Sequence, residues 1–252
     1  MIRFVTETGS TNTDLASELR AGMAVPEGEW LVADRQVSGR GRQGRAWFDG
    51  YGNFMGSTVV HLSPRDPNPA TLALVAGVAA YEAVSGVLAD PSLLKLKWPN
   101  DILLNGKKLA GILCECIAQS GYTPAVIVGI GINLNHTRFP ENIQDIATSL
   151  KLETGKNVNR TELALSLLQN LDSEYEDFLQ GKMENLIRKW TEQSDMFGKT
   201  VTVNQKGKTL TGVAMGLNPQ GKLILQTPDG KQHLLDSGEL LATGATGKTT
   251  SD

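Results

Sequence analysis

Cysteine and histidine are scarce in this sequence. Its 252 residues include two cysteines, Cys114 and Cys116, and three histidines, His61, His136 and His233, none at zinc-site spacing. We expect the cysteines to be buried free thiols, because residues two apart on a strand face the same side and cannot easily form a disulfide. No Gly-x-Ser-x-Gly turn occurs either, so hydrolase and metalloenzyme templates find no support.

Long hydrophobic runs are also missing. No apolar stretch approaches the about 20 residues of a membrane helix, and the start, Met1–Thr6, lacks the apolar core of a signal peptide. We therefore expect a cytoplasmic protein without a membrane partner. With 252 residues, 40% of them hydrophobic, the chain is long enough for one large domain and a small one.

Positive charge is concentrated in one short segment of a chain whose formal net charge is −3. Residues 34–45 contain the arginines Arg35, Arg40, Arg42 and Arg45 and the glycines Gly39, Gly41 and Gly44. Glycines let the backbone close around a ligand, and arginines donate to carboxylate and phosphate oxygens. The segment indicates an anionic ligand, although a solvated basic turn or a nucleic-acid patch is the plainer alternative.

The same glycines match the Gly-x-Gly-x-x-Gly pattern of dinucleotide-binding folds. In those folds the glycine turn opens a helix that binds the pyrophosphate at its N-terminus. Here residues 46–53 are aromatic and interrupted by glycines, without the apolar period of a helix. The context therefore argues against a dinucleotide-binding fold.

The rest of the chain predicts a mixed α+β domain followed by a small antiparallel barrel. Helices are expected at residues 15–20, 70–89, 160–180 and 183–194, and strands at 29–33, 93–98, 101–104, 109–117 and 125–134. Asn105-Gly106 predicts a tight hairpin turn. From Phe197 onward, short strand-like segments alternate with turn residues, as in a barrel. The end, residues 244–252, has the composition of a disordered tail.

A second cluster of polar and charged residues lies around the hairpin predicted at Asn105-Gly106. Lys97-Trp98-Pro99-Asn100-Asp101 ends one strand and presents a carboxylate. Lys108 opens a later strand, and Gly111 leaves a small hole on its surface. Because they are three residues apart, Lys108 and Gly111 should face opposite sides unless a bulge intervenes. From spacing alone, a plain hairpin with solvated lysines fits equally well.

Together these motifs resemble those of biotin protein ligases. The resemblance rests on residues 39–45, 97–101, 108–113 and 129–133, which occur in the family's order and approximate spacing. It implies a mixed, largely antiparallel sheet with helices, like that of class II aminoacyl-tRNA synthetases, followed by an SH3-like barrel. The implied domains are a catalytic biotin- and ATP-binding domain at residues 1–195 and the barrel at 196–243.

The resemblance also implies a reaction and roles for residues. Biotin's carboxylate would attack the α-phosphate of ATP, assisted by Mg²⁺, and a carrier-protein lysine would then attack biotinyl-5′-AMP. The implied catalytic residues are Arg40, Arg42, Lys108 and Asp101, with Asp101 also a possible metal ligand. Implied biotin contacts are Ser10, Thr11, Asn12, Gln36, Gly39, Arg40, Gly41, Arg42, Lys108, Gly111, Gly129 and Gly131. Implied ATP contacts are Arg40, Arg42, Arg45, Trp47, Lys108 and Asn133.

Some of these residues have simpler explanations. Ser10 and Thr11 could cap a helix, Gln36 could be a loop side chain, and a tryptophan such as Trp47 is more often core. Because the catalytic motifs start near Met1, the resemblance implies a monofunctional ligase that binds no operator DNA. Its partner would be the biotin carboxyl carrier domain of a carboxylase, and a monomer and a homodimer both remain open.

Two other functions are compatible with parts of the sequence. A lipoate or octanoate ligase or transferase would share the fold, but the glycine–arginine loop belongs to the biotin branch of the family. A nucleic-acid-binding module would explain the arginines and a small barrel. Such modules usually carry a broad basic surface, whereas acids balance the bases in the rest of this chain.

Overall fold

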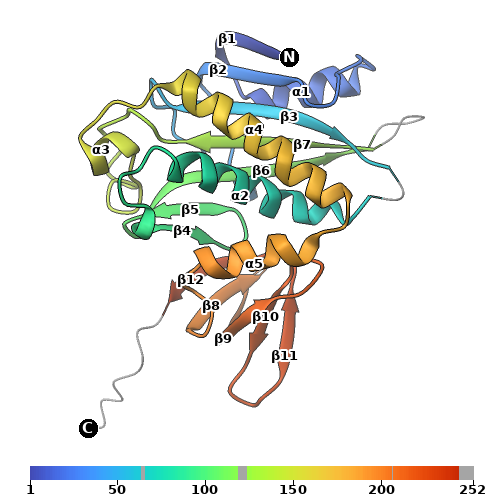
Figure 1. Ribbon diagram of the computed structural model, residues 1–252, viewed down its shortest axis with the longest axis vertical. Helices are drawn as coiled ribbons and strands as arrows, with labels where there is room; N and C mark the ends of the chain where they lie inside the picture. Colours follow the sequence, from blue (N-terminus) through green and yellow to red (C-terminus); the bar gives the residue numbers. More distant parts are fainter. Residues whose placement is uncertain (64–65, 119–123, 206, 244–252) are drawn as a thin grey trace.

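The computed structural model describes residues 1–63, 66–118, 124–205 and 207–243, which form two sheets with helices (Figure 1). Residues 242 and 243 are described by their backbone alone. The strands of the large sheet are β1 Ile2–Thr8, β2 Trp30–Gln36, β3 Phe54–His61, β4 Leu94–Lys97, β5 Asp101–Leu104, β6 Lys107–Ile117 and β7 Ala125–Ile132. The helices are α1 Thr11–Arg20, α2 Leu72–Ser85, α3 Leu150–Thr154, α4 Arg160–Leu179 and α5 Met183–Gln193. The strands of the small sheet are β8 Thr200–Gln205, β9 Lys208–Leu217, β10 Leu223–Gln226, β11 Gln232–Leu235 and β12 Glu239–Thr243.

The large sheet is mixed and mostly antiparallel. Its strand order is β1-β2-β3-β7-β6-β5-β4, and β1 and β2 are its parallel pair. The small sheet has the order β11-β10-β9-β8-β12 and is antiparallel throughout. This arrangement confirms the expected fold class. The boundary expected near residue 196 stays a prediction, and the expected tail lies outside the described residues.

Helices cover both faces of the large sheet. Helix α2 lies on one face, with α4 packed against it (Figure 1), and it buries nearly its whole surface because its sequence is apolar all round. The shorter α1 covers part of the other face through Leu15, Ala16 and Leu19. The rest of that face, beyond the N-terminus of α1, is therefore left for a binding site. Among the described residues, no helix has the length and apolarity to cross a membrane.

The hairpin between β5 and β6 decides which side chains reach that face. Asn105 and Gly106 both have positive φ angles, 52° and 75°, as a two-residue hairpin turn requires, so this turn is confirmed. The register of the two strands then shifts: Ile102 pairs with Ala110, but Leu103 pairs with Lys108. Leu109 is thus an extra residue in a bulge. The bulge lets Lys108 and Gly111 share one face, which regular alternation would forbid.

Three local expectations need correction. Helix α1 begins at Thr11 rather than Leu15, because Ser10 is its N-cap residue and Thr11 and Asn12 form its first turn. Strands β1 and β3 and the short helix α3 were not among the predicted segments. The cysteines are free, but Cys114 is half-buried, packed against the core cluster on the α2 side, and Cys116 is exposed. Burial raises the pKa of the Cys114 thiol to about 12, so this thiol stays protonated at neutral pH.

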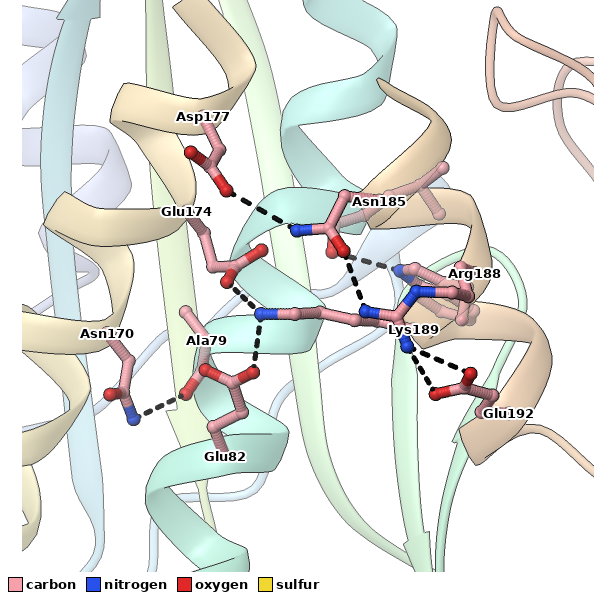
Figure 2. Close-up of polar contacts among 11 residues, drawn as sticks. Ala79, Glu82, Asn170, Glu174, Asp177, Asn185, Arg188, Lys189 and Glu192 are labelled. Carbon is pink, nitrogen blue, oxygen red and sulfur yellow. Dashed lines mark hydrogen bonds and ion pairs between the residues drawn. The ribbon is translucent and has the colours of Figure 1, made fainter. Parts of the chain in front are cut away.

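A lysine joins the three helices on the α2 face (Figure 2). Lys189 of α5 donates to Glu82 of α2 over 2.8 Å and also contacts Glu174 of α4. Glu174 is 5% exposed, so its carboxylate depends on Lys189 for compensation. Burial lowers the pKa of Lys189, but the hydrogen bonds and charges of the two glutamates outweigh this effect and raise it. The ammonium therefore stays charged.

We expect Lys189→Met to lower the free energy of unfolding by about 1 to 3 kcal/mol, measured by urea denaturation. Methionine keeps the apolar stem but leaves two carboxylates facing each other without a cation. The estimate is reduced because the Lys189 side chain is 25% exposed. The control is Lys231→Met, which removes a surface ion pair with Asp229 and should change stability little. Equal stability of the two variants would show that the cluster adds nothing.

Candidate active site

A cavity of about 220 Å³ lies on the α1 face of the large sheet. Its walls come from the start of α1, the end of β2, the middle of β3, the first part of β6, the last part of β7, and residues 40–48. The predicted site residues that line it are Ser10, Thr11, Asn12, Gln36, Arg40, Gly41, Arg42, Arg45, Trp47, Lys108, Gly111, Gly129, Gly131 and Asn133. Gly39 and Asp101 do not line the cavity but contact residues that do. The fold thus brings together motifs that are about a hundred residues apart.

A chain of hydrogen bonds fixes the polar wall beside α1. The Thr11 backbone N–H donates to Gln36 Oε1 over 2.7 Å, and Thr11 Oγ1 lies 2.6 Å from Ser57 Oγ. Ser57 donates to Asn12 Oδ1 over 2.6 Å. Because the Gln36 oxygen is occupied, its Nε2 group, which has no partner among the described residues, is left to donate to a ligand. The Ser10 side chain makes no helix-capping bond, so its hydroxyl is also available.

The glycine–arginine loop forms a small hairpin over the cavity. Gly41 N–H donates to Arg45 O over 2.7 Å, and Trp47 N–H donates to Gly39 O over 2.8 Å. A side chain at Gly39 would lie 2.8 Å from Trp47 O, so this close approach requires glycine. Residues 42–44 form a single 3₁₀ turn and open no helix, as argued above against a dinucleotide-binding fold.

Each arginine of the loop has an acceptor on a different element. Arg40 pairs with Glu115 over 3.1 Å, Arg42 donates to Asn100 Oδ1 over 2.9 Å, and Arg45 contacts Glu239 of the small sheet. Arg35 pairs with Asp49 over 3.0 Å and Glu7 over 3.3 Å, and does not line the cavity. Burial lowers the pKa of Arg42, and the nearby charge of Asp101 offsets part of this effect. As a guanidinium, Arg42 nonetheless remains charged.

The glycines of β6 and β7 make room for other side chains of the site. A Cβ at Gly129 would lie 2.1 Å from Asn12 Oδ1, and a Cβ at Gly131 would lie 2.5 Å from the Trp47 ring. Gly111 lies beneath the same indole and beside the Lys108 amine. The indole N–H of Trp47 is buried without a hydrogen-bond partner among the described residues. A buried orphan donor in a cavity wall is suited to an acceptor on a ligand.

Lys108 lies at the centre of the cavity's charged end. Its amine is 2.7 Å from Asp101 Oδ1 and 5.7 Å from the centre of the Trp47 ring. Asp101 pairs with Gly111 across β5 and β6, which brings the carboxylate next to the bulge. The geometry provides one lysine and two arginines, Arg40 and Arg42, around a common space. Such a group can hold two anionic groups close together.

Sequence reasoning missed one wall entirely. Phe139, Ile143, Ile146 and Ala147 line the cavity on an apolar side, and Ser57 and Asn100 were also not chosen. The segment that carries the apolar wall is held by Asn133, whose Nδ2 donates to Thr148 O over 3.0 Å. Asn133 therefore anchors this segment as well as lining the cavity. The isolated apolar residues of this loop have no period, so the sequence offered no signal beyond their position after Asn133.

Comparisons with known proteins agree with this geometry. Residues 5–133 match the biotin/lipoate A/B protein ligase family, and residues 196–240 match the biotin protein ligase C terminal domain. The biotin–[acetyl-CoA-carboxylase] ligase of Paracoccus denitrificans is 34% identical over 229 residues, which cover 89% of this chain and 94% of that protein. The bifunctional ligase/repressor BirA of Bacillus spizizenii is 35% identical over 228 residues, covering 88% of this chain and 68% of that protein.

A solved structure shows the same fold over nearly the whole chain. The biotin protein ligase from Aquifex aeolicus, in complex with biotin and ATP, superposes with a TM-score of 0.83. It is 32% identical, and the match covers 95% of this chain and 97% of that one. The chain therefore belongs to the biotin/lipoate A/B protein ligase family and, within it, to the biotin protein ligases.

Proposed function

We propose that this chain ligates biotin to a lysine of a biotin carrier protein, using ATP and passing through biotinyl-5′-AMP. The observation that supports this proposal is that the cavity has a polar wall, a charged end and an apolar wall. A polar wall at α1 suits a ring with amide-like groups, Lys108 and the loop arginines suit a carboxylate and a phosphate, and the apolar wall suits a base. Relatives of known activity match over most of the chain.

In the first step, two anions must approach each other. Biotin's carboxylate attacks the α-phosphorus of ATP, the new bond is an acyl–phosphate anhydride, and pyrophosphate leaves. Arg40 and Arg42 bind the carboxylate and the phosphate, and the Lys108 amine neutralises the charge that develops between them. Gln36 and Ser10 hold the ureido ring at the other end, which fixes the distance between carboxylate and phosphate.

The nucleotide occupies the far side of the cavity in this proposal. Phe139, Ile143 and Ile146 provide an apolar surface for the adenine ring, and Arg45 lies near the phosphates. Phe48 and Phe139 pack around His136, with ring centres 5.0 and 5.4 Å from the His136 ring, which stiffens this wall. Trp47 covers the junction between biotin and nucleotide and shields the anhydride from water.

Magnesium would enter with the ATP phosphates. The described residues contain no group of three acidic, histidine or cysteine side chains that could hold a metal, whereas Mg²⁺ commonly takes one or two carboxylates plus phosphate oxygens. Asp101 does not line the cavity, but its carboxylate is 2.7 Å from the Lys108 amine, which does, so Asp101 would be the residue that holds the ion. Bound there, the ion would neutralise phosphate charge. Asp101 also orients Lys108.

In the second step, a lysine amine of the carrier attacks the acyl carbon, an amide bond forms, and AMP leaves. We propose the biotin carboxyl carrier domain of a carboxylase as the acceptor. Operator DNA has no part in this proposal, because both steps use only biotin, ATP and the carrier lysine. The ATP requirement and the two free cysteines favour the cytoplasm.

The test is pyrophosphate release. We expect the protein to release pyrophosphate when it receives biotin, ATP and Mg²⁺, and then to add one biotinyl group to an apo carrier domain, detected by mass spectrometry. Lipoate and octanoate in place of biotin should release none. Release with lipoate or octanoate but not with biotin would contradict the proposal.

A further inference from the structure

Glu115 occupies a special position among the acceptors of the loop arginines. It lies on β6, with a side chain that is 25% exposed, and its two oxygens have different partners. Oε1 lies 3.1 Å from Arg40, and Oε2 accepts a hydrogen bond of 2.8 Å from Asn12. Glu115 therefore joins the glycine–arginine loop to the polar wall, without lining the cavity itself.

The bond to Asn12 sets the orientation of that wall. Asn12 Nδ2 donates to Glu115 and, over 3.3 Å, to Leu113 O, so both of its N–H groups are used. A carboxylate can only accept, hence the Asn12 amide must turn its oxygen toward Ser57, which donates to it. The direction of the hydrogen bonds in the wall thus depends on an acceptor at position 115.

The ion pair with Arg40 has a second effect. The Arg40 side chain is 49% exposed and sits on a loop rich in glycine, so without a partner it would sample many rotamers. Glu115 engages one amino group of the guanidinium, and other N–H donors remain for a ligand. The carboxylate holds Arg40 over the cavity before a substrate arrives.

We propose that Glu115 is a positioning residue for adenylate formation, acting through Arg40 on the reaction and through Asn12 on the biotin wall. This inference rests on the proposed function. In the alternative arrangement, the Glu115 carboxylate would occupy the place of biotin's carboxylate on Arg40. Biotin would then have to displace Glu115 before it could react. The two arrangements predict opposite changes when the charge is removed.

Glu115→Gln separates the two contacts. Its amide oxygen can still accept from Asn12, but the ionic partner of Arg40 is lost. We expect the KM for biotin to stay within about threefold of the wild-type value and the kcat of pyrophosphate release to fall about tenfold, since a displaced catalytic group costs rate more than affinity. Glu115→Ala removes both contacts and should raise the KM as well.

A double-mutant cycle with Arg40→Ala shows whether Glu115 acts through Arg40. In the Arg40→Ala background, Glu115→Gln should change kcat less than twofold, because its effect has already been lost. A merely structural effect would reduce kcat by the same factor in both backgrounds and would overturn the proposal. Thermal unfolding of each variant shows whether it is folded, and Glu176→Gln, an exposed residue on α4, is the control for the same change of charge.

The possible results distinguish a failure of this inference from a failure of the proposed function. If the wild-type protein released no pyrophosphate with biotin and ATP, the proposed function itself would be refuted. Wild-type release together with an unchanged kcat in Glu115→Gln would overturn the positioning role alone. A lower KM for biotin in Glu115→Gln would also overturn it and would identify Glu115 as a competitor of the substrate carboxylate.

Discussion

Arg40→Ala is expected to reduce the rate of biotin-dependent pyrophosphate release by about 100- to 1000-fold, the usual loss when one donor to a developing negative charge is removed. Arg40 lines the cavity, and its side chain is half-exposed on a loop rather than packed in the core. The fold should therefore be unaffected. Single-turnover measurement of pyrophosphate, with saturating biotin and ATP, gives the rate directly.

Arg188→Ala is the matched control for this variant. Arg188 lies on the surface of α5 and pairs with Glu192 in the same helix. Helix α5 is distant in sequence from the cavity residues and packs with α2 on the other side of the sheet (Figure 1). It should release pyrophosphate at the wild-type rate. If Arg40→Ala did the same, Arg40 would not bind the reacting groups, and the loop's role would fall to Arg42 and Arg45.

Gly129→Ala should raise the KM for biotin on the order of 100-fold, because losing about two hydrogen bonds to the ring costs about 2 to 3 kcal/mol of binding free energy. The added Cβ would lie 2.1 Å from Asn12 Oδ1, so the Asn12 amide must move. Its bonds to Ser57 and Glu115 would then break or lengthen, and the wall that holds the ring would lose its shape. Isothermal titration with biotin measures the loss of affinity independently of turnover.

The matching control is Gly86→Ala at the end of α2. There an added Cβ has its nearest contact at 3.6 Å, an ordinary distance, and the residue is remote from the cavity. It should bind biotin as the wild type does. Unchanged biotin affinity in Gly129→Ala would mean that Asn12 does not shape the biotin wall.

Local patterns in the sequence predicted much of the fold, whereas most residues of the candidate site were predicted by the resemblance to biotin protein ligases. The turn at Asn105-Gly106 needed positive φ angles, and helix α2 was recognisable because its residues are apolar on every side. Glycines and arginines at residues 39–45 predicted a ligand-covering loop for local chemical reasons. These features depend on neighbours within a few residues, which is why a single sequence can show them.

Tertiary structure alone decided how those residues face one another. The bulge at Leu109 puts Lys108 and Gly111 on one face, although their spacing predicts opposite faces. The contact between Asn12 and Glu115 spans more than a hundred residues of chain, and the apolar wall around Ile143 has no periodic signal. Such contacts depend on strand register and on the packing of distant segments, so no local pattern in the sequence specifies them.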